Sequence, residues 1–178
     1  MADKIKTNTM NWKTMKFSSA YRNLSAKPRL NLAIITCMDS RVVSDIFGLA
    51  VGDALIIRNA GNRISYDVVR SLLLAVYELG VTRILLCGHS GCGTVLEQEK
   101  ALEILQKVSD QSHIPVEELV HELGGLDSWN ALGAIEDVYE NVRKGLEILR
   151  QSKLFPQTVQ FSGAVYLVET GETEFLDG

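Results

Sequence analysis

The chain has 178 residues, close to the ~150 residues of a typical domain, so a single domain with modest additions is expected. Hydrophobic residues make up 46% of the sequence and charged residues 22%, which is typical of a globular protein and excludes a disordered or fibrous one. The 18 Lys and Arg against 22 Asp and Glu give a formal net charge of −4, which argues against a general basic surface for nucleic acid or anionic lipid.

Targeting and redox signals are also weak. No apolar run approaches the ~20 residues that cross a bilayer, so no membrane insertion is expected. Residues 1–16 lack an apolar stretch followed by a small-residue cleavage site, which predicts no secretory signal and a cytoplasmic location. Three Cys are an odd number for a disulfide framework, so the thiols are expected to serve in metal binding or reactivity.

The first part of the chain predicts an arm followed by a domain. Residues 1–29 are polar with scattered apolar side chains, which predicts an N-terminal helical arm that packs on another subunit. The domain then covers residues 30–178. Short apolar runs at 30–35, 54–58 and 83–87 predict strands buried on both faces of a parallel sheet, and residues 68–79 show helical spacing.

The remainder of the chain favours helices. Helices are predicted over residues 96–108 and 115–123, followed by a longer amphipathic helix over 135–149 and a late strand over 158–169. Strands that alternate with helices indicate an α/β fold, a three-layer domain with a mostly parallel β-sheet flanked by helices. Ligand sites of such folds lie beyond the carboxyl ends of the strands, so residues directly after each strand are the functional candidates.

Cysteine and histidine follow two of the predicted strands. Cys37 comes directly after the first, and His89 and Cys92 come directly after the third. Two thiolates and an imidazole suit Zn²⁺, and three protein ligands leave one coordination position open, which is typical of catalytic zinc. Each residue alone would more often be an ordinary core side chain, but their coincidence at one sheet edge favours a metal site.

A carboxylate and a guanidinium stand beside the first of these candidate ligands. Asp39 and Arg41 lie two residues apart and can form an ion pair. Asp39 can then accept a hydrogen bond from a zinc-bound water, or become the fourth ligand when Arg41 does not hold it, so both an open and a closed site are possible. Because two thiolates cancel the charge of Zn²⁺, the ion acidifies water less than a three-His set would, which predicts activity favouring alkaline pH.

The other Cys and His residues have structural interpretations. Cys87 lies inside a strand pattern, which favours packing in the core. His113 and His121 occur in polar helical sequence and are expected to be solvated.

Three rival motifs explain less of this sequence. The residues GHSGC at 88–92 resemble the serine hydrolase motif G-x-S-x-G, but Cys92 replaces the last glycine and no acid and His follow in a suitable order. Neither glycine-rich nucleotide fingerprint is present. A thiolate nucleophile at Cys37 with Arg41 as an anion-binding group would leave His89 and Cys92 unexplained.

The motifs CMDSR at residues 37–41 and GHSGCG at 88–93, with RNAG at 58–61 between them, resemble the β-class carbonic anhydrases. The resemblance covers residues 30–93 and resumes at 162–171. It implies that Cys37, His89 and Cys92 bind one Zn²⁺ per chain and that Asp39 and Arg41 form a catalytic dyad. It also implies a homodimer or homotetramer, with the helical arm reaching across to the partner.

Members of that family are zinc lyases that interconvert CO₂ and bicarbonate, with a zinc-bound hydroxide attacking CO₂ in a small apolar pocket. Ala50 stands where plant-like members carry Gln, so the chain is similar to the smaller archaeal and bacterial-like subgroup. Relatives in that subgroup hydrolyse carbon disulfide or carbonyl sulfide on the same site, which is the enzymatic alternative. A non-catalytic zinc-binding protein whose site is closed by Asp39 is the alternative from another class.

Overall fold

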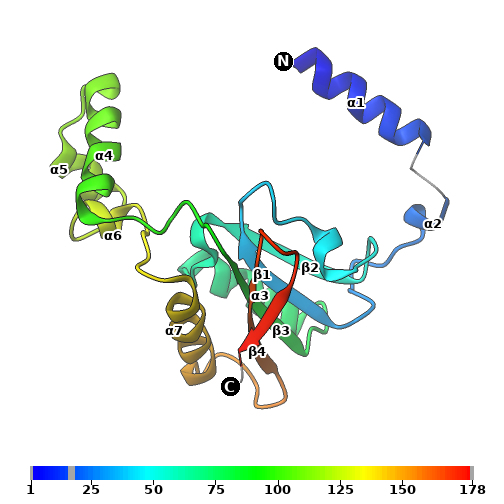
Figure 1. Ribbon diagram of the computed structural model, residues 1–178. Coiled ribbons are helices and arrows are strands. Elements are labelled where there is room, and N and C mark those ends of the chain that lie inside the picture. Colours follow the sequence, from blue (N-terminus) through cyan, green and yellow to red (C-terminus); the bar gives the residue numbers. More distant parts are fainter. Residues whose placement is uncertain (1, 16–18, 177–178) are drawn as a thin grey trace.

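The computed structural model describes residues 2–15 and 19–176; residues 1, 16–18 and 177–178, which belong to the predicted arm and the C-terminus, lie outside the described residues. A five-stranded sheet in the order β2-β1-β3-β4-β5 forms the centre of the molecule (Figure 1). Strands β2, β1, β3 and β4 are parallel, and β5 is antiparallel to β4. The strands are β1 Leu32–Cys37, β2 Ala54–Asn59, β3 Arg83–His89, β4 Gln160–Tyr166 and β5 Thr173–Leu176. The predicted mostly parallel sheet is confirmed.

The register of the parallel strands places the carboxyl ends of four strands at one edge of the sheet. Cys37, the last residue of β1, pairs with Asn59, the last residue of β2. His89 ends β3 and pairs with Tyr166 at the end of β4. The loops that leave these strands therefore start side by side, which is where an α/β fold presents its ligand site.

Helices cover one face of the sheet and bury the larger apolar core. They are α3, Tyr66–Tyr77, and α7, Val138–Gln151, whose buried side chains join those of β1 and β3 in one cluster. The opposite face carries a smaller cluster that packs against the segment of the short helix η1, Ser44–Phe47. The buried residues of this smaller cluster are Ile34, Cys87 and Ala164. The prediction of a sheet flanked by helices is confirmed.

The chain between β3 and α7 forms a helical lobe, residues 96–132, which lies to one side of the sheet (Figure 1). Its helices are α4 Gln98–Ser112, α5 Val116–Glu122 and α6 Ser128–Ala131. Ala101 and Leu105 of α4 are buried. Within the lobe, the indole N–H of Trp129 donates to the carbonyl of Leu96 at 2.7 Å, which ties the start of the lobe to its end.

The N-terminal helices stand apart from the sheet. They are α1, Ala2–Met15, and α2, Ser19–Arg22, and α1 projects away from the body of the molecule in Figure 1. Within α1, the side chain of Ile5 is 62% exposed. The arm is thus helical, and the boundary between an arm and a domain at residues 29 and 30 stays a prediction. Over the described ranges, no helix has the length and apolar character to span a membrane.

Several predicted element boundaries were wrong. The long amphipathic helix begins at Val138 rather than at residue 135, because the Asp137 side chain accepts a hydrogen bond from the N–H of Glu140 and caps the helix. The late strand spans Gln160–Tyr166 rather than 158–169, and the chain then reverses near Gly171, where φ is 78°, into β5, a strand that the sequence did not predict. The first helix of the lobe spans Gln98–Ser112 rather than 96–108. None of these shifts moves a candidate site residue.

Candidate metal centre

The structure brings the predicted ligands Cys37, His89 and Cys92 together. All three are buried, and one ligand atom from each lies within 4.8 Å of the others. Cys37 ends β1 and His89 ends β3, while the loop after β3 returns Cys92 to the same position. That return requires a tight turn at Gly91, whose φ of 58° is in the left-handed region that favours glycine.

His89 is oriented by its own loop. The backbone carbonyl of Ser90 can only accept, so the ring Nδ1 of His89 carries the proton and donates to it at 2.9 Å. The lone pair of Nε2 is thereby directed into the cluster. Nε2 is buried and has no hydrogen-bond partner among the described residues. A buried unpartnered imidazole nitrogen is costly, and a metal ion bound there would satisfy it.

The two sulfur atoms lie at the separation that a zinc ion requires. The Sγ atoms of Cys37 and Cys92 are 3.8 Å apart. Zn–S bonds of about 2.3 Å at a tetrahedral angle separate two sulfurs by about 3.8 Å. Together with the imidazole of His89, this donor set fits Zn²⁺ with one coordination position left for a further ligand.

Without a cation, the two thiols oppose each other's ionisation. The hydrogen bond between their sulfurs lowers the pKa of Cys37 below its ordinary value and raises that of Cys92 above it. The hydroxyl of Thr94 lies 3.0 Å from the Cys92 sulfur and partly offsets the rise in its pKa. A dication at this position would remove the conflict, because it stabilises both thiolates.

Asp39 and Arg41 form the predicted pair beside the cluster. Arg41 donates from Nε to Oδ1 at 2.9 Å and from Nη2 to Oδ2 at 2.8 Å, the two-pronged geometry that guanidinium and carboxylate favour. These bonds lower the pKa of Asp39 well below its ordinary value, so the carboxylate is ionised. Its Oδ2 lies 3.8 Å from Nε2 of His89. Asp39 is therefore held by Arg41 at the margin of the cluster, the open arrangement of the two that the sequence allowed.

Arg58 is a site residue that sequence reasoning left without a role. It is the second-last residue of the neighbouring strand β2, and it donates from Nε to the carbonyl of Cys37 at 3.0 Å and from Nη2 to the carbonyl of Asp39 at 2.6 Å. These bonds fix the backbone that carries both residues. Its position near the end of a strand next to β1 is the signal that could have identified it.

Ser90 and Glu169 form a second unforeseen contact. The Ser90 hydroxyl donates to a carboxylate oxygen of Glu169 at 2.5 Å and accepts the N–H of Val168 at 2.8 Å. The bond from Ser90 lowers the pKa of Glu169. Because the hydroxyl serves to tie this loop to the chain after β4, the serine hydrolase interpretation has no support in the geometry.

The remaining Cys and His residues lie elsewhere. Cys87 is fully buried in the smaller apolar cluster on the other face of the sheet, and this burial raises the pKa of its thiol to about 12. His113 and His121 are exposed on the helical lobe. All three therefore have the structural roles that the sequence indicated.

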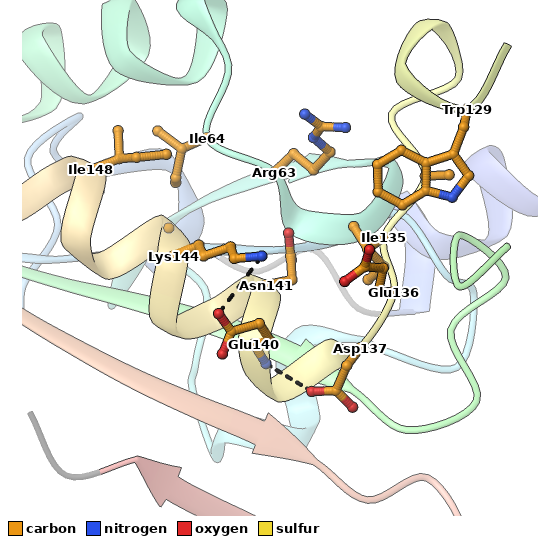
Figure 2. Close-up of a pocket in the computed structure, with 12 residues that line it drawn as sticks. Arg63, Ile64, Trp129, Ile135, Glu136, Asp137, Glu140, Asn141, Lys144 and Ile148 are labelled. Carbon is orange, nitrogen blue, oxygen red and sulfur yellow. Dashed lines mark hydrogen bonds and ion pairs between the residues drawn. The ribbon is translucent and has the colours of Figure 1, made fainter. Parts of the chain in front are cut away.

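A cavity of about 330 Å³ lies between α7, the loop before it and the helical lobe. Figure 2 shows Trp129 and Arg63 on one side of it and the α7 residues Glu140, Asn141 and Lys144 on the other. None of the cluster residues lines this cavity. The candidate chemistry is thus at the sheet edge and outside the cavity.

Comparisons with known proteins agree on one family. A family model described as carbonic anhydrase matches residues 32–173, which include every candidate site residue. The crystal structure of a carbonic anhydrase from Streptococcus mutans is 32% identical, covers 99% of this chain and 96% of its own, and gives a TM-score of 0.78. The structure of a β-carbonic anhydrase from Trichomonas vaginalis, 26% identical, covers 96% of this chain and 93% of its own with a TM-score of 0.81. A carbon disulfide hydrolase from Acidithiobacillus thiooxidans is 30% identical over 159 residues, 84% of this chain and 79% of that protein.

Proposed function

Because the chain belongs to the β-carbonic anhydrase family, we propose that it interconverts CO₂ and bicarbonate at a site where Cys37, His89 and Cys92 hold one Zn²⁺ per chain. The observation that carries the metal assignment is the sulfur separation of 3.8 Å beside the unpartnered Nε2 of His89. These are the donor types and the spacing that tetrahedral zinc takes.

The chain's own residues supply the groups around the reacting water. When bound, the zinc ion supplies Lewis acidity that makes a water molecule nucleophilic. With zinc bound, Asp39, which is ionised and lies 3.8 Å from Nε2 of His89, would accept a hydrogen bond from that water and orient it. Arg41 keeps Asp39 in this position, so that the carboxylate would not itself become a zinc ligand. Arg58 holds the backbone of the loop in place while these contacts form.

Stopped-flow measurement of CO₂ hydration on protein of known zinc content tests the proposal. We expect fast hydration that rises between about pH 7 and about pH 9, because two thiolate ligands leave the ion less able to acidify water. Stoichiometric zinc with no hydration at either pH would contradict the activity and would favour a closed, non-catalytic zinc site.

Hydrolysis of carbon disulfide or carbonyl sulfide is a second candidate. It is favoured by the 30% identity to a carbon disulfide hydrolase over most of both chains. The two activities are separated by supplying CO₂, carbon disulfide and carbonyl sulfide to the same zinc-loaded preparation. Turnover of the sulfur compounds without hydration of CO₂ would select the second candidate.

A homodimer or homotetramer is also proposed. It is supported by the position of α1, which projects away from the sheet while Ile5 on it is 62% exposed (Figure 1). Light scattering on the full chain and on a chain without residues 1–15 tests this: a mass of at least two chains is expected for the former and a lower mass for the latter. The cytoplasmic location indicated by the sequence stays a prediction.

A further inference from the structure

Asn141 connects helix α7 to the turn that follows β2. It lies in the first half of α7, and Figure 2 shows it on the cavity side of that helix beside Glu140 and Lys144. Its side-chain Nδ2 donates to the backbone carbonyl of Gly61 at 2.9 Å, although the two residues are 80 positions apart in the sequence. Gly61 lies in the short helix η2, Ala60–Asn62. A side-chain amide on the long helix thus holds a peptide next to the proposed metal centre.

Gly61 packs directly on the residue that supports one sulfur ligand. Its φ of 70° is left-handed, and a Cβ added there would lie 2.6 Å from Oγ1 of Thr94. That hydroxyl is 3.0 Å from the sulfur of Cys92. The backbone of Gly61 therefore sets how closely Thr94 can approach, and Thr94 in turn contacts Cys92.

The turn that contains Gly61 also lies against β1, the strand that ends at the other sulfur ligand, Cys37. Gly61 is thus placed between the strand that carries Cys37 and the Thr94 side chain that contacts Cys92.

The neighbouring side chain does not anchor this turn. Asn62 is 1% exposed, and neither its Oδ1 nor its Nδ2 has a hydrogen-bond partner among the described residues. Its φ of 47° is also left-handed, a conformation that an ordinary residue adopts at some cost. A turn in this conformation needs an external restraint, and the amide of Asn141 supplies one.

We propose that Asn141 is a positioning residue of the metal centre: by holding the carbonyl of Gly61, it fixes the turn against which Thr94 packs and so orients the sulfur ligand Cys92. This inference rests on the proposed function, since it assigns to Cys37 and Cys92 the role of zinc ligands. It adds a residue of α7 to a site whose other members come from the strand-end loops.

Three variants at one position test the proposal. Asn141→Asp keeps the shape but removes the donor, Asn141→Leu removes all polarity, and Asn141→Gln keeps a donor on a longer side chain. The matched control is Lys144→Gln, one turn along α7 on the same cavity, whose ion pair is with Glu140 at 3.7 Å. For each protein we would measure the zinc dissociation constant by competition with a chelator, the thiolate-to-cobalt absorption of the Co²⁺-loaded form, and thermal unfolding of the metal-free form.

Zinc affinity is expected to depend on whether the side chain at position 141 can donate a hydrogen bond. Asn141→Asp and Asn141→Leu should weaken zinc binding about 10- to 100-fold, the usual effect of removing a group that orients metal ligands, and should alter the cobalt spectrum. Asn141→Gln should recover part of the affinity, and Lys144→Gln should match the parent.

Two results would overturn the proposal. One is zinc affinity and a cobalt spectrum in Asn141→Asp and Asn141→Leu that equal those of the parent. The other is a destabilisation of the metal-free variants that is large enough to account for their weaker zinc binding. Asn141 would then act on the stability of the whole fold and not on the metal ligands. A parent that binds zinc tightly but hydrates no CO₂ would contradict the proposed function and leave this inference standing.

Discussion

The sheet and the helical lobe are both built from regular elements, yet only the sheet carries candidate chemistry. The metal cluster and the Asp39–Arg41 pair lie at the ends of β1 and β3, where parallel strands bring loops of distant sequence together. The lobe buries Ala101 and Leu105 within α4, and its histidines, His113 and His121, are exposed. Reactive residue types occur in both regions, but a site forms only where the ends of neighbouring strands bring such residues together.

The largest expected effect is a difference between the same substitution at two cysteines of the sheet, Cys37 and Cys87. Cys37→Ser should reduce bound zinc from one per chain to nearly none and abolish CO₂ hydration, because a hydroxyl does not replace a thiolate ligand. Cys87→Ser should keep both zinc and activity, since Cys87 lies in the apolar cluster on the other face. Metal analysis and stopped-flow assays check this, and the reverse pattern would refute the ligand assignment.

Loss of the guanidinium beside the site should give the next largest effect. Arg41→Ala should lower CO₂ hydration about 10- to 100-fold with zinc retained, because Asp39 is no longer held away from the metal. Arg70→Ala is the matched control, since Arg70 also forms an ion pair with a nearby aspartate, donating from Nε and Nη2 to Oδ1 of Asp67 on the surface of α3. Equal rates in the parent and Arg41→Ala would remove the pair from the mechanism.

A change inside the lobe should leave the site intact. Leu105→Ala removes a buried side chain and should cost about 2–5 kcal/mol within the lobe, whereas Leu102→Ala, at a half-exposed position, should cost less. Hydrogen exchange should quicken over residues 98–131 and stay unchanged over β1, while zinc content and activity remain those of the parent. Loss of zinc in Leu105→Ala would show that the lobe and the sheet are one cooperative unit.

The smallest effect concerns the pH dependence of stability in the metal-free protein. Hydrogen bonds from Arg41 lower the folded-state pKa of Asp39, so ionised Asp39 stabilises the fold above the ordinary carboxyl pKa of about 4. That contribution is lost as the pH falls through the lowered pKa. The difference in urea midpoint between the parent and Asp39→Asn should therefore be small at about pH 7 and smaller at about pH 3. A difference in urea midpoint that grows as the pH falls would contradict a stabilising ion pair between Asp39 and Arg41.

The residues that carry the proposed chemistry could be predicted from the sequence because their motifs are local. Cys37, Asp39 and Arg41 fall within five consecutive positions, and His89 and Cys92 are three apart, each group directly after an apolar run. Strand ends in a parallel sheet share an edge, so the two loops had to meet. The later part of the chain was less predictable, since β5 and the cap at Asp137 depend on contacts with distant segments.

The sequence by itself determined the donor set, the parallel sheet and the pairing of Asp39 with Arg41, because each follows from neighbouring residues and from strand order. Only the tertiary structure decided that Arg41 holds Asp39 in the open arrangement. It also decided that Arg58 donates hydrogen bonds to the backbone of the same loop and that the Asn141 amide donates to the carbonyl of Gly61. The physical reason is that these contacts join segments with no common pattern in the sequence. Their geometry is set by how β2 pairs with β1 and by how α7 packs on β3 and β4.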